Sequence, residues 1–359
     1  MANDASENQA VLDFVDLDQV DIDEIVKILS GSLSTSGATA KNIAFWSWKH
    51  VHNPAGRSLG LAAKSLSDGS LIAVRPMMHW RFKTPCFSEL CQVVRPVDTV
   101  THPDWRGKGI FRSLTLRAIS KLGNTTINLA FNTPNKNSLP GYLKLGWQKA
   151  CELQVYLALG RSSAIFNRVI GKRVFSLVES PWEKISHGAT YGASKLSEEQ
   201  VDEILGHCSE FEGRRMCSGF RTFRDVKFLR WRFIEQPNVD YGFTIVRDSQ
   251  DKIQSVVVAR LEIRAGLLVA LIQDVFVADS KLSTVRRAIK GVRKDLNVAF
   301  LAAHFIKGSI EYKAMMTSGF LPVKKVTLAV REIGKPTESL INFKAENRWD
   351  LTLSDIEVF

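Results

Sequence analysis

Two short blocks of this chain share one pattern at positions far apart. Residues 45–54 read FWSWKHVHNP, and residues 228–237 read FLRWRFIEQP. Both place a phenylalanine, a tryptophan, a basic residue, a β-branched apolar residue, an amide residue and a proline at the same spacing. Six matches in ten positions indicate a duplicated unit. A duplication constrains the fold strongly, because both copies must fold alike.

The same order of predicted elements follows each block. After the first block the patterns predict a strand hairpin, a strand, a helix, a buried strand, a short helix ending at a glycine and a final strand, over residues 59–83, 89–103, 109–122, 126–134, 138–147 and 151–159. The second block is followed by the same order as far as residue 333. We therefore expect an α/β fold of the α+β type, with mixed sheets built from two similar units.

Charge is distributed unevenly along the chain. The net charge is +11, but residues 1–40 hold eight acids and one base, so the rest of the chain carries about +18. A basic body suits an anionic partner such as a phosphorylated cofactor, a nucleotide sugar, nucleic acid or a membrane surface. An ordinary soluble surface rich in Lys and Arg gives the same composition. No zinc-finger, RNP or helix-turn-helix pattern is present, so we expect no nucleic-acid partner.

Targeting and metal signals are absent from the sequence. The N-terminal MANDASENQA is acidic and polar, unlike a secretory signal. The longest apolar runs are far shorter than a membrane-spanning helix requires. The five cysteines form no CxxC pair and have no metal-ligand spacing with histidine. We expect a cytoplasmic protein with reduced thiols, no metal and no transmembrane segment.

The segment THPDWRGKGIFRSLTLRAI (101–119) carries the strongest chemical signal. It follows a predicted strand and opens a predicted helix, where free backbone N–H groups and the helix dipole favour an anion. Gly107 and Gly109 let the main chain approach a bulky anion, and Arg106 and Lys108 add positive charge. The segment is neither a Walker loop nor a dinucleotide fingerprint. The alternative is an ordinary strand–helix turn.

At these residues the chain resembles the GCN5-related N-acetyltransferases. Residues 106–110, RGKGI, match that family's pyrophosphate-loop pattern Arg/Gln-x-x-Gly-x-Gly/Ala through Gly109, with Phe111 at the last position. The family's second motif is matched by NKNSLPGYLKLGW (135–147), which follows the next predicted strand. The resemblance covers residues 10–160. The chain is also similar to tandem-domain members associated with bacterial surface-polysaccharide synthesis, which carry the F-x-x-W-[KR]…[NQ]-P block.

The resemblance implies direct transfer of an acetyl group from acetyl-CoA to a primary amine. Backbone amides of the glycine loop would hold the pyrophosphate, and the preceding strand would hydrogen-bond the pantetheine arm and polarise the thioester. The residues that it implies for acetyl-CoA binding are Val100, Thr101, Arg106, Gly107, Lys108, Gly109, Ile110 and Asn135.

The resemblance also implies an acid for the leaving thiolate and a base for the acceptor ammonium. Tyr142 is the candidate acid, because it stands four residues before Gly146, where the family has its acid tyrosine. Asp98 is the candidate base, since its spacing to Val100 places both on one face of a predicted strand. His102 and the terminal carboxylate of Phe359 are alternatives. The alternative for Tyr142 is a tyrosine that packs a short helix on the sheet, and the alternative for Asp98 is a strand-edge aspartate that pairs with an arginine.

The second unit lacks the cofactor pattern. Its loop, FVADSKLSTVRR (276–287), contains no glycine, and Met315 and Gly308 stand where the first unit has Tyr142 and Asn135. We therefore predict a catalytic acetyl-CoA-binding domain (1–160), a basic linker (161–195), a degenerate second domain (196–335) and a C-terminal tail (336–359).

The acceptor is expected to be a small-molecule amine. The basic segment RRAIKGVRK (286–294) of the second unit could meet an anionic sugar nucleotide that carries an aminosugar, or it could be a solvated helix face. Amino acids, polyamines and protein lysines are open as acceptors as well. Two other functions fit the same architecture. Fem-type aminoacyl transferases are tandem units of this fold but have no need for the RGKGI loop, and a degenerate unit pair could serve as a non-catalytic binding or scaffold protein.

Overall fold

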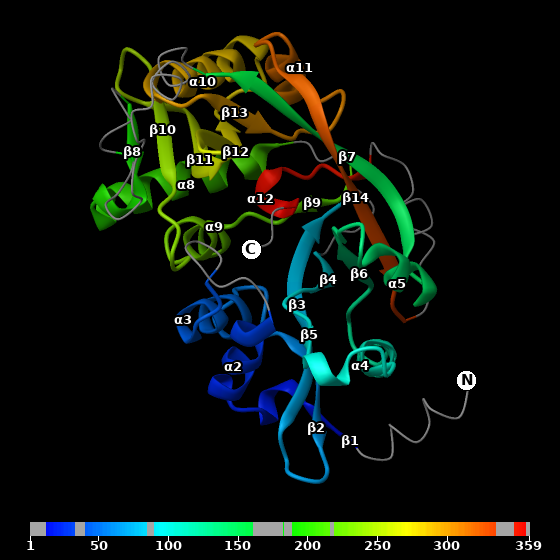
Figure 1. The fold of residues 1–359 in the computed structure, drawn as a ribbon. Helices are drawn as coiled ribbons and strands as arrows, with labels where there is room; N and C mark the ends of the chain where they lie inside the picture. The colour runs from blue at the N-terminus through cyan, green and yellow to red at the C-terminus, as the bar shows by residue number, and fades with distance from the viewer. Residues whose placement is uncertain are drawn as a thin grey trace.

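The computed structural model describes two units of mixed α/β structure joined along one sheet (Figure 1). The described residues are 12–32, 40–84, 90–160, 182, 189–215, 219–334 and 348–356. Most of the predicted linker 161–195 and most of the predicted tail 336–359 lie outside them.

The first unit contains the elements predicted around the first block. They are β1 (Leu12–Asp16), η1 (Leu17–Gln19), α2 (Ile22–Ser32), α3 (Ile43–Trp46), the π-helical turn η3 (Ser47–Val51), β2 (Leu59–Ser65), β3 (Leu71–Lys83), β4 (Cys91–Pro96), β5 (Val100–Thr101), η4 (Pro103–Trp105), α4 (Ile110–Leu122), β6 (Leu129–Asn132), α5 (Leu139–Lys144) and β7 (Gln148–Leu159). The predicted strand 89–103 is broken after Pro96, and only Val100 and Thr101 resume it.

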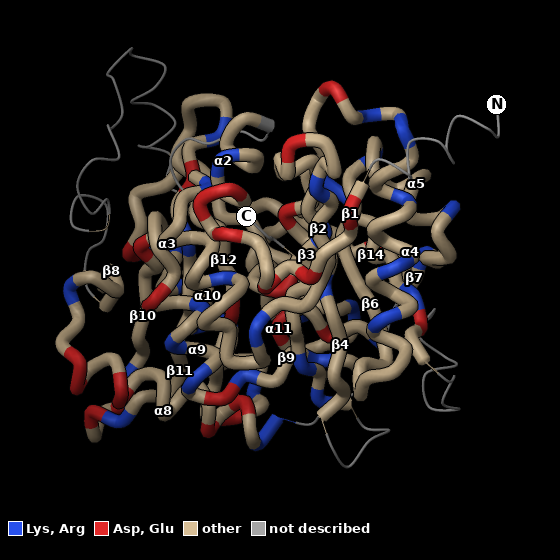
Figure 2. Tube along the Cα trace, turned by 90° about the horizontal axis from the view of Figure 1, so that it is seen from below, with Lys and Arg blue, Asp and Glu red and all other residues tan. Residues whose placement is uncertain are grey.

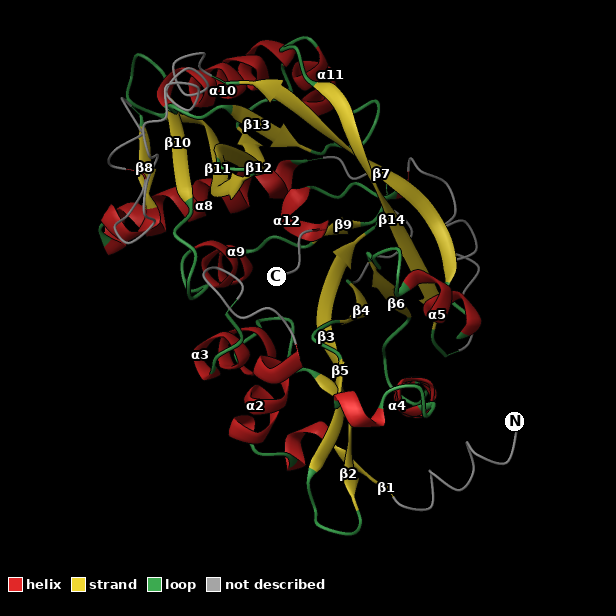
Figure 3. Cartoon of the chain, viewed as in Figure 1, coloured by secondary structure: helices red, strands yellow, loops and turns green. Residues whose placement is uncertain are grey.

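The second unit repeats the order from helix to final strand (Figure 3). It comprises β8 (Thr190–Gly192), η5 (Ala193–Lys195), α8 (Glu198–Arg214), β9 (Arg221–Thr222), α9 (Val226–Phe233), β10 (Gly242–Arg247), β11 (Ile253–Arg264), β12 (Leu267–Val277), α10 (Leu282–Asp295), β13 (Phe300–Ala303), α11 (Ile310–Met316), β14 (Leu321–Glu332) and α12 (Leu353–Ile356). The predicted mixed α/β class and the tandem arrangement are confirmed.

The two units exchange their last strands. The sheet order is β1-β2-β3-β4-β6-β14-β7-β13-β12-β11-β10-β8, so β14 of the second unit lies against β6 of the first. In return β7 of the first unit pairs with β13 of the second. Each unit's sheet is therefore completed by a strand of the other. The predicted division at residue 160 stays a prediction, and the exchanged strands cross it in both directions (Figure 1).

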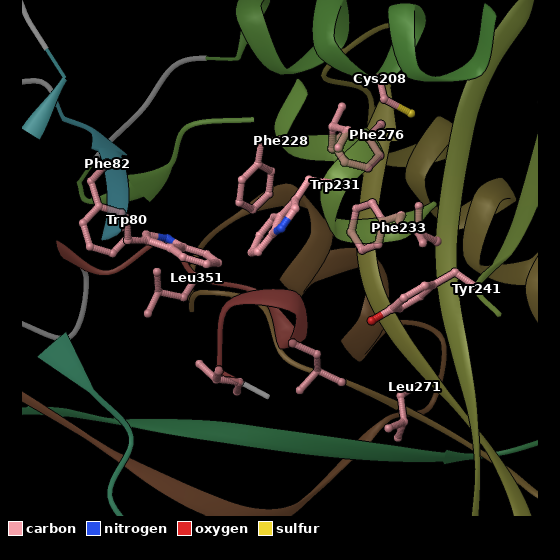
Figure 4. Packing of buried hydrophobic residues seen from close by; sticks show 14 of the residues in the cluster. Trp80, Phe82, Cys208, Phe228, Trp231, Phe233, Tyr241, Leu271, Phe276 and Leu351 are labelled. Carbon is pink, nitrogen blue, oxygen red and sulfur yellow. The ribbon is translucent and has the colours of Figure 1, made fainter. Parts of the chain in front are cut away.

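The tryptophans of the two repeated blocks form a symmetric contact with each other. Trp48 and Trp231 stack on one another with ring centroids 4.8 Å apart and planes 16° apart. Each indole Nε1 donates to the other residue's backbone carbonyl, at 2.7 and 2.8 Å. The two blocks thus meet face to face. Trp80 and Phe228 pack edge-on into the same cluster (Figure 4).

The C-terminal segment that the structure describes is buried between the units. Trp349 and Leu351 are fully buried in the largest apolar cluster, and α12 lies at the centre of the molecule (Figures 1 and 4). Arg224 anchors it through an ion pair with Asp355 and a second ion pair with Asp274 of β12. Residues 348–356 therefore act as part of the core.

Candidate active site

A cavity of about 660 Å³ opens in the first unit at the carboxyl ends of β4 and β6. These two strands run parallel at Val93–Leu129 and Val94–Ala130, and ligands of α/β sheets bind at such strand ends. The chain after each strand lines the cavity, together with the first block, α4 and α5. The lining residues are Lys41, Lys49, 95–101, Arg106, Phe111, 132–135, Ser138 and Tyr142.

The glycine loop has the backbone conformation that its sequence predicts. Gly107 and Gly109 have φ of 78° and 76°, in the left-handed region where a side chain is strained. Gly109 is the N-cap of α4, so the unpaired N–H groups of the first helical turn begin directly after it. Figure 2 shows Lys and Arg segments near the labels of α4 and α5. The arrangement suits an anionic ligand at the rim of the cavity.

The charged residues of the loop take different positions. The Arg106 guanidinium lines the cavity and donates from Nε to the Thr101 carbonyl at 3.2 Å. The Lys108 ammonium lies 4.7 Å from the centre of the Trp105 ring. Arg106 therefore ties the loop to β5, while Lys108 stands on the exposed side of the loop.

The other predicted acetyl-CoA residues are spread around the cavity. Val100 and Thr101 line it and pair with β3. The Ile110 side chain packs into the core beneath α4, leaving only its backbone to the loop. The Asn135 Oδ1 accepts hydrogen bonds from the backbone N–H groups of Asn137 and Ser138, at 3.0 and 2.9 Å. Asn135 therefore holds the turn that leads into α5.

Tyr142 is buried at the cavity wall and is held by an arginine. Its hydroxyl accepts a hydrogen bond from Arg75 Nη1 at 3.0 Å, and the same nitrogen donates to Thr99 Oγ1 at 2.6 Å. A guanidinium group has no acceptor, so the tyrosine must be the acceptor in this bond. Its own O–H hydrogen is therefore left to be donated elsewhere, as an acid requires.

Arg75 is a functional candidate that the sequence reasoning missed. It is fully buried on β3, between Phe111 and Tyr142, with its guanidinium 4.8 and 5.1 Å from their ring centres. Its Nε and Nη2 find no hydrogen-bond partner among the described residues. The Asn132 Oδ1 in the cavity wall likewise has none there. The signal in the sequence was a single charge inside the apolar run LIAVRPMM.

Asp98 does not lie on a strand. Its φ of 46° interrupts the extended backbone between β4 and β5. The prediction that Asp98 and Val100 share one face of a strand is therefore wrong. Its carboxylate is 2.8 Å from Lys41 Nζ, 2.5 Å from Lys49 Nζ and 3.1 Å from His50 Nε2. Burial alone would raise its pKa, but Lys49, His50 and Lys41 hold the pKa of this carboxyl well below its usual range. So acidic a group accepts protons poorly.

Lys49 and His50 also have lowered pKa values, which for these basic groups favours the neutral form. Burial lowers the pKa of the Lys49 ammonium to about 7, against the attraction of Asp98, and Lys41 and Arg95 lower it further. Burial also lowers the pKa of His50, whose Nδ1 is 2.9 Å from Ser58 Oγ. Both residues come from the turn η3, which belongs to the repeated block.

The two alternative bases lie elsewhere. The His102 side chain is 45 % exposed, and its Nδ1 accepts from the Asp104 backbone N–H at 3.4 Å, in the turn before the glycine loop. Phe359 lies outside the described residues. The described chain ends at Ile356, whose carbonyl accepts from Arg95 Nη2 at 3.3 Å and from Thr133 Oγ1 at 3.2 Å. Both donors line the cavity.

A second cavity, of about 840 Å³, occupies the corresponding place in the second unit. It lies at the carboxyl ends of the parallel strands β12 and β13. The N-cap of α10 is Lys281 rather than a glycine, and the buried Glu311 forms an ion pair with Arg215 in the cavity wall. The cavity thus keeps its position while its lining has changed.

A metal-ligand cluster and a membrane-spanning helix are both missing from the described residues. Within the described ranges, no cluster of three or more His, Cys, Asp or Glu residues is arranged to hold a metal ion. None of the helices in that part of the chain is long and apolar enough to cross a membrane.

Comparisons with solved structures identify the fold. No family model matches the sequence, and no curated protein matches it significantly. A GCN5-related N-acetyltransferase from Anabaena variabilis superposes with a TM-score of 0.59 at 10% identity, covering 89% of this chain and 72% of that one. A probable N-acyltransferase from Enterococcus faecalis gives 0.59 at 13% identity, covering 90% and 73%.

Saccharomyces cerevisiae N-myristoyltransferase with bound myristoyl-CoA is similar over both units. It gives a TM-score of 0.55 at 9% identity and covers 91% of this chain and 84% of its own. These likenesses confirm the predicted fold: the chain has the fold of the GCN5-related N-acetyltransferases over about nine tenths of its length.

Proposed function

We propose that this protein is an acyl-CoA-dependent N-acyltransferase that moves the acetyl group of acetyl-CoA directly to a primary amine. One observation carries the proposal: Arg106 and Phe111, which flank the left-handed Gly107 and Gly109, line the same cavity as Tyr142, at the ends of parallel strands. The Asn132 Oδ1 in the cavity wall supports it, because this buried acceptor finds no partner among the described residues and is available to a ligand in the cavity.

Binding would use the backbone of the first unit. The pyrophosphate would lie on the N–H groups after Gly109, where the helix dipole favours negative charge, with Arg106 beside it. The pantetheine arm would extend along Val100 and Thr101 at the cavity wall. The proposal does not require direct contact of acetyl-CoA with Lys108 or with the side chain of Asn135, since Lys108 lies over Trp105 and Asn135 caps a turn.

Tyr142 would act as the general acid. The O–H hydrogen left by the Arg75 bond would be given to the thiolate as the C–S bond breaks. The buried guanidinium of Arg75 would stabilise the negative charge that develops on the phenolate oxygen at that moment. Arg75 thus acts through Tyr142 and is a positioning residue.

The acceptor is a small-molecule amine in this proposal. Aminosugars, including nucleotide-linked ones, head the candidates because of the sequence resemblance to polysaccharide-synthesis members and the basic body of the chain. As an enzyme of polysaccharide synthesis that acts on nucleotide-linked aminosugars, the protein would work in the cytoplasm. A panel that also contains amino acids, polyamines and peptides, each offered with short-chain and long-chain acyl-CoA, identifies both substrates.

The first test is a calorimetric titration of the protein with acetyl-CoA, beside Gly109→Arg. We expect micromolar binding by the wild type and loss of binding in the variant, because the new side chain lies across the loop. Gly69→Arg is the matched control: Gly69 has a φ of 71° in the β2–β3 turn, open space around it and no contact with the cavity. The Gly69→Arg variant adds the same charge and similar backbone strain, and it should bind acetyl-CoA with wild-type affinity.

Two outcomes decide between the proposal and its rivals. Binding that is lost in Gly109→Arg alone, followed by turnover on any member of the panel, establishes the transferase. No binding of any acyl-CoA by the wild-type protein rejects it. The non-catalytic scaffold or the Fem-type aminoacyl transferase then becomes the better description, and an aminoacyl-tRNA binding assay separates these two.

A further inference from the structure

One buried acceptor atom in the cavity wall has no hydrogen-bond partner among the described residues. This atom is Oδ1 of Asn132, the last residue of β6, whose side chain lines the cavity. Asn132 is only 5 % exposed, so its oxygen is largely removed from bulk water. A buried amide oxygen that loses its hydration and gains no hydrogen bond destabilises the folded protein, which makes this position unusual.

The Asn132 side chain lies on the same face of the sheet as Tyr142. Asn132 pairs with Ala329 of β14, and residues opposite one another on antiparallel strands point to the same face. Ala329 belongs to the apolar cluster that contains Tyr142, and so does Ala130, two residues before Asn132 on β6. Asn132 and Tyr142 therefore line the cavity from one face of the sheet.

The second unit shows which residue the fold itself accepts at this position. The strands β6 and β13 are equivalent, because each is four residues long and begins opposite a valine of its parallel neighbour. Each is also followed, after the same interval, by the serine that caps the next helix, Ser138 or Ser309. The equivalent of Asn132 is thus Ala303, the last residue of β13, which is fully buried in an apolar cluster.

Two further positions show the same contrast. Counted along the ladders that pair β3 with β4 and β11 with β12, Val257 stands where the first unit has Arg75. Met315 stands where it has Tyr142. Val257 and Met315 are buried in the same apolar cluster as Ala303. The fold therefore packs well with apolar residues at all three positions, and the polar residues of the first unit are better explained by a ligand than by packing.

The group that suits Asn132 Oδ1 is a hydrogen-bond donor, because an amide oxygen can only accept. The thioester and the pyrophosphate of acetyl-CoA are themselves acceptors. The amine substrate, in contrast, carries N–H groups, and its nitrogen has to reach the thioester carbon in the cavity that Asn132 and Tyr142 both line. The chemistry of the proposed reaction therefore brings a donor to this acceptor.

We propose that Asn132 Oδ1 accepts a hydrogen bond from the amine substrate and positions its nitrogen for attack on the thioester. The inference rests on the proposed function. A neutral primary amine has two N–H groups and one lone pair, so one N–H can be held by Asn132 while the lone pair faces the carbonyl carbon. No proton moves to or from Asn132 in this role, which is one of substrate binding and orientation.

Thermal unfolding tests the unpartnered oxygen without any substrate. Asn132→Ala introduces the residue that the second unit has. No hydrogen bond of Oδ1 within the described structure is lost, so we expect the melting temperature to fall by less than about 2 °C.

The matched control is Asn53→Ala. Asn53 is also 5 % exposed and lies outside the cavity, but its Nδ2 donates to the His79 carbonyl and its Oδ1 accepts from the Ala55 backbone N–H, each at 2.9 Å. Loss of these two bonds should lower the melting temperature by about 4 °C or more. An equal fall in Asn132→Ala would show that Oδ1 has a structural partner and would overturn the inference.

Steady-state kinetics test the contact with the amine, using the panel amine that has the highest kcat/KM. In Asn132→Ala we expect kcat/KM for the amine to fall about 30-fold, because one hydrogen bond to the substrate is lost. The acetyl-CoA Kd, measured by calorimetry, should change less than about twofold. Asn132→Asp keeps an acceptor oxygen and removes the amide donors, so its kcat/KM should stay within about threefold of the wild type. Asn53→Ala, measured below its melting temperature, should match the wild type.

The possible failures are distinguishable. The pantetheine arm of acetyl-CoA also carries amide N–H groups, so a weakened acetyl-CoA affinity in Asn132→Ala assigns the oxygen to them and overturns the inference. An unchanged kcat/KM for the amine in Asn132→Ala, or an equal loss in Asn132→Asp, overturns it as well and leaves the transferase standing. A wild-type protein that binds no acyl-CoA, or that acetylates no amine of the panel, rejects the proposed function and this inference with it.

Discussion

The two units use the same fold and place a cavity at the same point, yet the walls of the two cavities differ. In the first, glycines open the way to the N-terminus of α4, and a tyrosine held by a buried arginine faces the cavity. In the second, Lys281 caps α10, and Met315 stands at the place of Tyr142, in the core. The comparison shows that the fold maintains the cavity while the residues that line it differ between the two units.

The shared features have a structural explanation that is independent of catalysis. The exchanged strands β7 and β14 need both units, and the Trp48–Trp231 pair needs both blocks. A second unit that has lost the loop and the tyrosine still completes the first unit's sheet. Packing therefore requires both copies, while the residues that we propose for the chemistry occur in one copy. The predictions below test each side of this comparison.

The largest effect is expected at the symmetric contact. Trp48→Ala and Trp231→Ala each remove a buried indole and a hydrogen bond, which should cost about 3–5 kcal/mol of unfolding free energy. Because Trp48 and Trp231 make equivalent contacts, we expect their two losses of unfolding free energy to agree within about 1 kcal/mol. The double variant should lose less unfolding free energy than the sum of the two. Chemical denaturation of the three variants measures this. A large loss for one residue beside a negligible loss for the other contradicts the symmetric reading.

The next prediction sets the two cavities against each other. Gly109→Arg should weaken acetyl-CoA binding at least 100-fold, or about 2.7 kcal/mol. Gly308→Arg changes a glycine in the second cavity that also has a positive φ, 93°, and open space around it. We expect its acetyl-CoA affinity to equal that of the wild type in the same calorimetric titration. Equal weakening by both substitutions would show that the second cavity also contributes to cofactor binding.

Local patterns in the sequence predicted the helices, strands and loops of this structure, but they did not predict the contacts between distant segments. The order of elements, the repeat and the glycine loop follow from local patterns, because periodicity and glycine spacing are local properties. The strand exchange did not follow, since a strand's pattern does not name its partner. The ion pair between Arg224 and Asp355 joins residues 131 positions apart, which no local pattern reveals.

The error at Asp98 has a related cause. The strand-like composition of residues 89–103 predicted one strand, and the left-handed backbone at Asp98 interrupts it. A non-glycine residue is held in that conformation by its surroundings, here by Lys41, Lys49 and His50, which lie about 50 residues earlier in the sequence. Three of the four members of this cluster were therefore invisible as site residues until the fold brought them together.

A smaller effect is expected from the tyrosine that the second unit lacks. Tyr142→Phe removes the hydroxyl and keeps the ring against Phe111 and Trp147, so acetyl-CoA affinity should be unchanged while kcat falls about 100-fold. The counterpart is Met315→Leu, a buried substitution of similar volume in the second unit, for which we expect wild-type kcat. Steady-state kinetics with the acceptor found in the panel measures both. Unchanged turnover in Tyr142→Phe removes this residue from the acid role.

The smallest effect is expected at Arg75, and it decides whether the tyrosine works alone. Arg75→Met keeps much of the side-chain volume on β3 and removes the charge and the bond to Tyr142, so kcat should fall about tenfold. In the Tyr142→Phe background the same substitution should leave kcat unchanged, because there is no hydroxyl left to orient. A merely structural arginine would lower activity equally in both backgrounds. That result would separate Arg75 from the acid, and it would mean that the tyrosine alone distinguishes the acid position of the first unit from that of the second.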